Sequence, residues 1–141
     1  MRLVLDTNVV ASAMLWGGRP RELLQLGREQ RIELFTSLPL LAELTDILGR
    51  PKFSHKIAAS RLTADQLVDG YARLAALVRP LPIERTAPDP DDDVVIATAL
   101  AAHADLVVTG DKPLLSLAQH QGIAIVGVVQ AIEAIAADRG T

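Results

Sequence analysis

Residues 2–15 of the chain read RLVLDTNVVASAML. RLVLD (2–6) has the continuous apolar character of a strand buried on both faces, and TNVVASAML (7–15) is typical of the helix that follows such a strand. A strand joined directly to a helix begins a parallel β-α-β unit, because parallel neighbours need a crossover connection. Asp6 ends this strand, at the edge where open parallel sheets bind their ligands.

The same alternation of short apolar runs and helical segments continues along the chain. IELFTS (32–37), DLVVTGD (105–111) and IAIVG (123–127) are predicted strands, and VRPLPI (78–83) is a weaker strand whose prolines suit a sheet edge. Helices are predicted over 7–15, 21–30, 38–49, 63–78, 91–104, 113–121 and 128–139. Right-handed crossovers then lead to a Rossmann-like α/β fold, a three-layer α/β/α sandwich with a central, mostly parallel sheet of about five strands.

Length and composition favour one domain over residues 1–141, because half of the residues are hydrophobic and can form a core. The absence of cysteine excludes disulfides, thiolate metal sites and cysteine nucleophiles. No apolar run approaches the roughly 18 residues of a membrane span, and the N-terminus lacks the design of a signal peptide. We therefore expect a cytoplasmic protein with no membrane partner.

Charge is distributed unevenly along a chain of net charge −3. Residues 19–61 hold eight basic and five acidic side chains, whereas residues 84–141 hold nine acidic and three basic ones. A strongly basic surface for nucleic acid is absent, although the basic segment can lie beside an acidic pocket whose charge a metal offsets. Lys52 and Lys56 are candidates for phosphate contacts, with solvated surface charge as the other interpretation.

Trp16 is expected to be a packing anchor, since four scattered aromatic residues make no base-stacking platform.

Two carboxylates follow predicted strands, at the edge where parallel strands end. Asp6 follows the first strand, and Asp111 follows Val107-Val108-Thr109-Gly110. Each has a simpler interpretation: Asp6 as a helix cap, and Asp111 as a turn residue before Lys-Pro.

Two further acids lie near apolar helix faces. Glu43 is three residues after Leu40 and four before Ile47, so it flanks the apolar stripe of its helix, whereas Asp46 falls on the solvated side. In PDPDDD (88–93), Asp93 lines up with the apolar Ala97, while the preceding acids suit a helix cap.

These four carboxylates, if they converge, need either raised pKa values or a cation. Unit charges about 4 Å apart repel by roughly 4 kcal/mol per pair at an effective dielectric near 20, against a domain stability of only about 5–15 kcal/mol. Oxygen ligands without Cys or His select Mg²⁺ or Mn²⁺. Such ions activate water and stabilise the leaving oxygen in phosphodiester hydrolysis. Thr7, Asn8 and Thr109 are expected to supply nearby polar contacts.

Four features in this order together resemble the PIN (PilT N-terminal) domain family. They are DTN at 6–8, the glutamate of the third helix, DPDDDVVIATAL (89–100) and LVVTGD (106–111). The resemblance covers roughly Leu3 to Val128 and implies a Mg²⁺- or Mn²⁺-dependent ribonuclease acting on single-stranded RNA, as in the VapC-like toxins of bacterial toxin–antitoxin pairs. It also implies a catalytic and metal-binding quartet, Asp6, Glu43, Asp93 and Asp111, with Asn8 and Thr109 as polar neighbours. Asp92 is an alternative to Asp93 as the third acid.

The resemblance implies partners as well. These are a single-stranded or structured RNA, a cognate antitoxin protein and a second copy of the chain, for which the apolar stripe of 63–78 is one candidate face and core packing the other use. A haloacid-dehalogenase-like phosphatase is disfavoured because its second Asp is here Asn8. The alternative that stays open is a catalytically silent regulatory or protein-interaction module with the same fold.

Overall fold

A computed structural model describes residues 1–87 and 89–139 of the chain. The strands are β1 Arg2–Leu5, β2 Glu33–Thr36, β3 Ala76–Leu77, β4 Leu106–Val108, β5 Gln119–His120 and β6 Ile123–Val126. The helices are α1 Thr7–Leu15, α2 Gly18–Arg28, α3 Leu38–Leu48, α4 Ser54–Ser60, α5 Ala64–Leu74, α6 Pro90–Ala101, α7 Lys112–Leu115 and α8 Val128–Arg139, with a short 3-10 helix at Pro51–Phe53.

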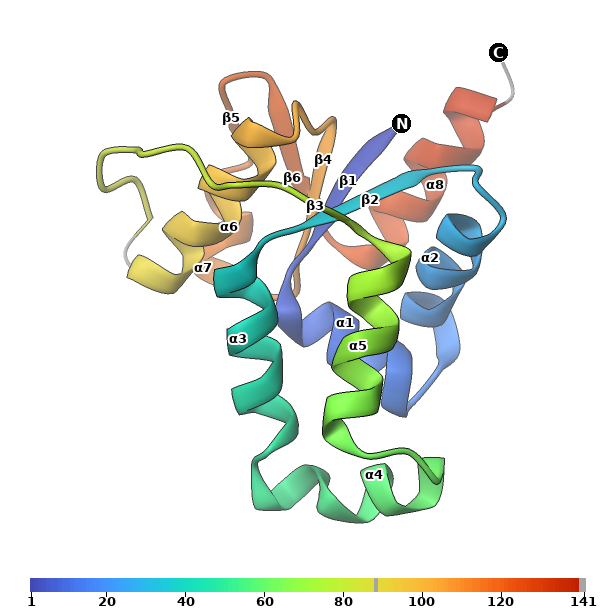
Figure 1. Cartoon of the computed structure of the whole chain (residues 1–141). Helices are drawn as coiled ribbons and strands as arrows, with labels where there is room; N and C mark the ends of the chain where they lie inside the picture. Colours follow the sequence, from blue (N-terminus) through green and yellow to red (C-terminus); the bar gives the residue numbers. More distant parts are fainter. Residues whose placement is uncertain (88, 140–141) are drawn as a thin grey trace.

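The strands form one sheet in the order β3-β2-β1-β4-β6-β5, in which only β5 runs antiparallel to its neighbour. Side chains alternate across it, so that Leu3 and Leu5 face the core beneath α1, α2, α3, α5 and α8, whereas Val4 faces the core beneath α6. Figure 1 shows these helices on the two faces of the sheet. The predicted three-layer α/β/α sandwich is confirmed.

The predicted strand at 78–83 is wrong. β3 lies at Ala76–Leu77, where it pairs with the end of β2, and the predicted helix 63–78 accordingly ends at Leu74. The ladder ends where the Val78 amide donates to the Thr36 carbonyl. Beyond this point Pro80 and Pro82 have no amide hydrogen to donate, and the chain continues as an irregular strap over α6.

Two further segments differ from the expected elements. The helix predicted at 113–121 is only α7, and Gln119–His120 form the antiparallel β5. Gln121 (φ 48°) and Gly122 (φ 85°) make the tight turn into β6, since a two-residue hairpin turn of this kind requires positive φ at both positions. The sheet therefore has six strands instead of about five, and α4 was not expected at all.

The apolar stripe of α5 is used inside the molecule. Thr63 begins the helix with a capping box, in which its hydroxyl accepts from the Gln66 amide at 3.1 Å and the Gln66 side chain accepts from the Thr63 amide at 2.9 Å. Leu67 and Tyr71 then belong to the core shared with α1, α2 and α3. Core packing is the use that the structure shows for this stripe.

No helix within residues 1–87 and 89–139 combines the length and apolar character that crossing a membrane requires.

Candidate active site

Asp6 is a buried carboxylate at the end of β1, with 5% of its surface exposed. Its amide donates to the Val108 carbonyl of β4 at 2.8 Å, which continues the sheet, and its side chain caps α1 by accepting from the Thr7 amide at 2.8 Å. Burial raises the pKa of Asp6, and hydrogen bonds from Thr109 and Thr7 oppose that rise. The charge of Asp111 raises the pKa further, so the two carboxylates interact electrostatically.

Thr109 connects these two acids. Its buried hydroxyl donates to the Asp6 carboxylate at 2.7 Å and accepts from the Asp111 amide at 3.0 Å. Asp111 in turn caps α7 by accepting from the Leu114 amide at 3.1 Å. The ends of β1 and β4 thus hold two carboxylates on either side of one hydroxyl, as the strand-end positions indicate.

Glu43 joins them from α3. It is half-buried, whereas Asp46 on the same helix is exposed, as the helical spacing predicts. Burial is the largest cause of the raised pKa of Glu43, and a hydrogen bond with the Thr7 hydroxyl opposes it. The negative charge of Asp6 raises this pKa further, which places Glu43 within the electrostatic reach of the strand-end acids. Asn8 is exposed on the first turn of α1.

Asp92 is the acid of α6 that faces this cluster. Its pKa is raised to about 7, chiefly by burial and then by a hydrogen bond with Asp111 and the charge of Asp111. The charge of Asp6 adds to the same effect. Asp92 therefore shares a hydrogen bond with one strand-end carboxylate and is repelled by both.

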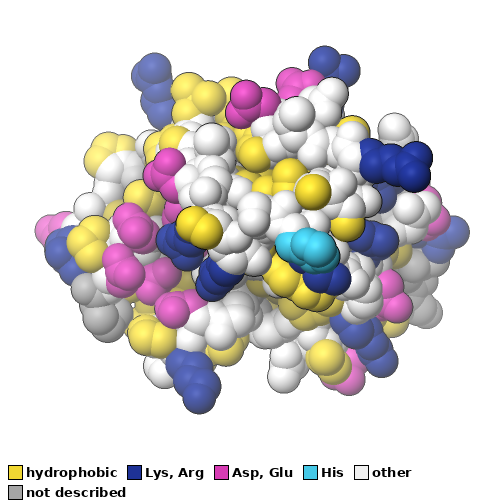
Figure 2. All heavy atoms as spheres, turned by 90° about the horizontal axis from the view of Figure 1, so that it is seen from below, with side chains coloured by type: hydrophobic (Ala, Val, Ile, Leu, Met, Phe, Trp, Pro, Cys, Tyr) yellow, Lys and Arg dark blue, Asp and Glu magenta, His cyan; other side chains and the backbone are white. Residues whose placement is uncertain are grey.

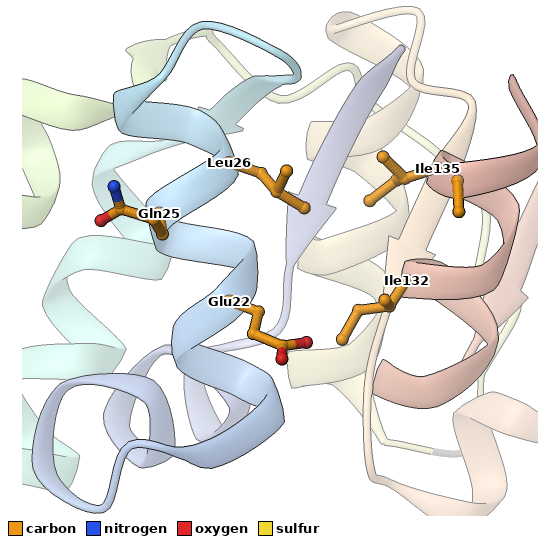
Figure 3. A pocket seen from close by; sticks show the side chains of 6 residues that line it. Glu22, Gln25, Leu26, Ile132 and Ile135 are labelled. Atoms are coloured by element: carbon orange, nitrogen blue, oxygen red, sulfur yellow. The ribbon is translucent and has the colours of Figure 1, made fainter. Parts of the chain in front are cut away.

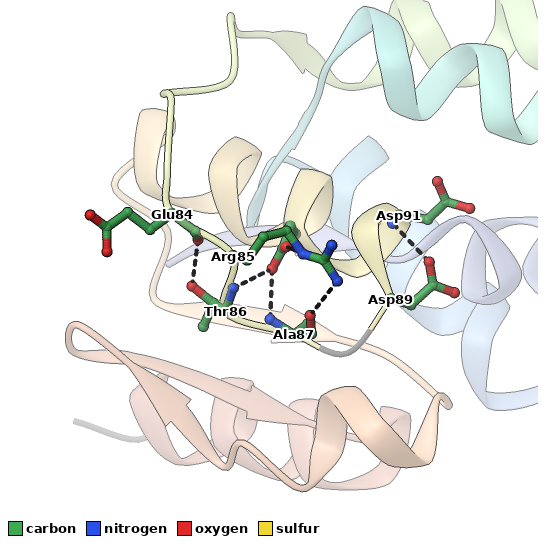
Figure 4. Close-up of polar contacts among 7 residues, drawn as sticks. Glu84, Arg85, Thr86, Ala87, Asp89 and Asp91 are labelled. Carbon is green, nitrogen blue, oxygen red and sulfur yellow. Dashed lines mark hydrogen bonds and ion pairs between the residues drawn. The ribbon is translucent and has the colours of Figure 1, made fainter.

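Asp93 has different partners (Figure 4). One carboxylate oxygen accepts from the Thr86 amide at 3.1 Å and from the Ala87 amide at 2.7 Å, and the other pairs with the Arg85 guanidinium at 2.9 Å. The Arg85 side chain also donates to the Ala87 carbonyl at 3.3 Å. These contacts attach the strap before α6 to the first turn of that helix. Electrostatic interactions thus link Asp6, Glu43, Asp92 and Asp111, whereas the Asp93 carboxylate contacts Arg85, Thr86 and Ala87.

A buried hydroxyl pair, which the sequence analysis did not single out, sets α3 against α6. The Thr98 hydroxyl donates to the Val94 carbonyl at 2.8 Å, so at 2.9 Å from the Ser37 hydroxyl it acts as the acceptor. Both side chains are fully buried. Because Glu43 lies on α3 and Asp92 on α6, this contact helps to fix their relative positions. A threonine within the apolar run IATAL was the available signal.

Helix ends supply part of the compensation for the acids. Asp6 caps α1, Asp89 caps α6 and Asp111 caps α7. A carboxylate at a helix N-terminus gains about 0.3–1 kcal/mol from the helix dipole. Each close carboxylate pair costs roughly 4 kcal/mol at an effective dielectric near 20. The helix dipoles therefore offset only part of the repulsion that closely spaced carboxylates would experience.

The donor chemistry of the cluster fits a hard divalent cation, since all its ligand atoms are oxygens. Within residues 1–87 and 89–139, however, no three His, Asp or Glu side chains are close enough together to hold a metal ion. Burial, together with the charges of neighbouring acids, raises the pKa of Asp6, Glu43 and Asp92, so the site disfavours full ionisation of these carboxyl groups.

A separate hollow between α2 and α8 is the clearest apolar pocket, with a volume of about 280 Å³. Figure 3 shows Leu26 of α2 facing Ile132 and Ile135 of α8 across it, with Glu22 at its edge. One carboxylate among apolar walls offers no hydrolytic chemistry, and none of the four clustered acids lines this pocket.

Comparison with known proteins decides the family. Residues 2–113 match the family model described as PIN domain. The chain belongs to the PIN domain family. The resemblance drawn from the sequence is thereby confirmed, and the matched segment contains Asp6, Glu43, Asp92 and Asp111. PIN domains are generally metal-dependent nucleases, which supports a hydrolytic kind of activity for this chain.

A solved structure has the same PIN fold. The crystal structure of VapBC2 from Rickettsia felis bound to a DNA fragment from its promoter contains a chain that is similar to this one, with a TM-score of 0.60 and 15% sequence identity. The match covers 90% of this chain and 98% of that one. At this identity the likeness concerns the fold. No curated protein matches the chain significantly.

Proposed function

We propose that this PIN-domain protein is a Mg²⁺- or Mn²⁺-dependent ribonuclease that hydrolyses phosphodiester bonds of single-stranded RNA. The observation that carries the proposal is the convergence of Asp6, Glu43, Asp92 and Asp111 at the carboxyl ends of the strands, three of them with raised pKa values. Family membership adds the expectation of nuclease chemistry.

The proposed third acid is Asp92. The sequence favours Asp93 and leaves Asp92 as the alternative, because the helix that carries both residues is apolar on nearly every side. The hydrogen bond between Asp92 and Asp111 supports Asp92, because a metal ligand has to share a site with the other carboxylates. The pairing of Asp93 with Arg85 supports a structural role for Asp93.

The four carboxylates would hold the divalent ion, which supplies an activated water and stabilises the leaving oxygen. Thr109 fixes the orientation of Asp6 by donating to its carboxylate, and its contact with the Asp111 amide keeps the two strand-end acids in register. Thr7 contributes a backbone donor to Asp6 and a hydroxyl contact to Glu43. These contacts hold the carboxylates on rigid elements before RNA arrives.

A matched pair of variants on α3 tests the ribonuclease. Glu43→Gln removes a clustered charge, and Asp46→Asn removes an exposed one from the same helix. With a panel of single-stranded RNAs and Mn²⁺, Glu43→Gln is expected to lower the cleavage rate on the order of a hundredfold or more, since metal catalysis contributes several kcal/mol. Asp46→Asn is expected to cleave like the wild type. Equal cleavage by all three proteins would exclude Glu43 from the catalytic site, whereas no cleavage by the folded wild type would favour the silent module.

We also propose that the protein is the toxin of a toxin–antitoxin pair and is bound by a cognate antitoxin protein. The support is its fold, which it shares with a chain of the VapBC2 structure. Induced expression of the wild type in bacteria is expected to arrest growth, because cellular RNA would be cut. Expression of Asp6→Asn to the same level is expected to leave growth unchanged. Growth arrest by both proteins would show that toxicity does not come from the acidic cluster.

A further inference from the structure

Trp16, the only tryptophan of the chain, is unusually exposed for its size. It follows α1 directly and leaves 52% of its surface in solvent, whereas the preceding Leu15 is buried. Its ring lies edge-on to that of Phe53, with the ring centroids 5.5 Å apart and the planes at 75°. Phe53 is 9% exposed and anchors the contact. Trp16 is therefore only partly the packing anchor that the sequence suggested.

Two lysines complete a patch, called here the Trp16 patch, of Trp16, Phe53, Lys52 and Lys56. The Lys56 ammonium lies 5.5 Å from the centroid of the Trp16 ring, and the Lys52 ammonium lies 5.1 Å from that of Phe53. Cation–π contacts of this kind hold the ammonium groups beside the rings while leaving them in solvent. The patch thus combines an exposed aromatic surface with two positive charges.

The position of the Trp16 patch relates it to the acidic cluster. α1 begins at its cap Asp6 and ends beside Trp16. Its nine residues, at 1.5 Å of rise each, separate the two by about 14 Å. Figure 2 views the molecule from below, toward the carboxyl end of β1. Acidic side chains gather at the left of this face, and Lys, Arg and hydrophobic side chains lie across its middle.

We infer that the Trp16 patch binds single-stranded RNA beside the acidic cluster, with a base stacked on Trp16 and neighbouring phosphates near Lys52 and Lys56. This inference rests on the proposed ribonuclease function. An acidic cluster repels a polyanion, and a cation compensates only the phosphate that reacts. At about 14 Å, beyond the Debye length of about 8 Å at physiological salt, the patch can attract phosphates without being cancelled by the acids.

The chemistry of the patch favours RNA over a protein partner. Single-strand binding sites combine basic grooves with aromatic side chains on which bases stack. Lysine, in contrast, is depleted from the cores of protein–protein interfaces. One ammonium group over the exposed Trp16 ring and a second over the buried Phe53 ring suit a ligand that is both flat and anionic.

Trp16 itself reports binding, because it is the only tryptophan. The probe is an oligoadenylate too short to fold, titrated in EDTA so that no metal-dependent cleavage occurs. We expect saturable quenching of the Trp16 emission in the wild type. Trp16→Ala, followed by anisotropy of a labelled oligoadenylate, is expected to bind about tenfold more weakly, with Trp16→Phe in between, as expected for loss of one base stack.

The lysines are tested by salt. The double variant Lys52→Gln, Lys56→Gln is expected to bind more weakly and to lower the slope of log affinity against log salt by about 1.4, since each neutralised phosphate of a single strand contributes about 0.7. Arg31→Gln is the matched control, because Arg31 pairs with Glu29 at the start of β2, away from the patch. Its salt slope is expected to equal that of the wild type.

Two results would overturn the inference. The first is oligoadenylate binding that is equally tight in wild type and Trp16→Ala and leaves the Trp16 emission unchanged. The second is a blue shift of that emission with protein concentration alone, which would assign the patch to contact between protein copies. Cleavage without quenching would remove this inference and leave the ribonuclease intact. Quenching without cleavage would contradict the ribonuclease and leave the RNA-binding patch.

Discussion

Asp92→Asn is expected to abolish RNA cleavage, lowering its rate on the order of a thousandfold, because it removes a charged ligand from the proposed metal site. The same substitution is expected to stabilise the protein in EDTA above pH 7. The pKa of Asp92 is about 7 in the folded protein against an ordinary 3.8, so the folded state keeps a proton that the unfolded state releases. Stability of the wild type therefore falls as pH rises from about 4 to about 7.

Asparagine is neutral at every pH and resembles the protonated carboxyl in shape. The melting temperature of Asp92→Asn in EDTA is therefore expected to exceed that of the wild type above pH 7 and to equal it near pH 4. Differential scanning fluorimetry across this range, with Mn²⁺ added in a second series, checks both parts. Mn²⁺ is expected to raise the melting temperature of the wild type more than that of the variant. A variant that is less stable than the wild type above pH 7 and still cleaves RNA would contradict the assignment of Asp92.

Asp93→Ala is expected to have the opposite effect. It removes the acceptor of the Ala87 amide and breaks the ion pair between Asp93 and Arg85, so the free energy of unfolding is expected to fall by about 3 kcal/mol, as for hydrogen bonds to a charged group. Asp93→Asn keeps an oxygen for the two backbone amides and is expected to lose about 1 kcal/mol. Below their melting temperatures, both variants are expected to cleave RNA within a few-fold of the wild type.

Chemical denaturation of the Asp93 variants, with Asp91→Ala as the matched control, measures these losses. Asp91 is exposed on the same helical turn, and its removal is expected to cost only a few tenths of a kcal/mol of helix-dipole interaction. If folded Asp93→Asn loses as much cleavage as Asp92→Asn, the third acid is Asp93 and the structural role assigned to it is wrong.

The sequence predicted the parts of the fold that depend on continuous apolar runs. β1, β2, β4 and β6 lie within the expected strands, because each is buried on both faces of a parallel sheet. β5 could not be recognised from its own two residues, Gln119 and His120, which form a strand only because the turn at Gly122 returns the chain onto β6. The strand predicted at 78–83 is misplaced for the same reason, because pairing with a neighbouring strand decides its position. β3 forms at Ala76–Leu77, where the chain pairs with β2.

The candidate site shows a similar division. Strand ends gave Asp6 and Asp111, and helical spacing gave Glu43. The sequence could not distinguish Asp92 from Asp93 as the third acid. Neighbouring residues of a helix differ by about 100° in direction, but α6 is buried on several sides, so its apolar pattern does not indicate which direction faces the site. The two acids differ in their partners, since Arg85 of the irregular strap forms an ion pair with Asp93. Such a contact has no periodic signal.

The central claim is that the carboxylate cluster binds a divalent ion and cuts RNA with it. The most direct measurement is cleavage of a mixed panel of single-stranded RNAs by the wild type and by Asp6→Asn, in Mn²⁺ and in EDTA, with Mn²⁺ binding to both proteins measured by calorimetry. We expect the wild type to bind Mn²⁺ and to cleave only in its presence, and Asp6→Asn to do neither while remaining folded. Cleavage by the wild type in EDTA, or a folded wild type that neither binds Mn²⁺ nor cleaves any RNA of the panel, would contradict this account.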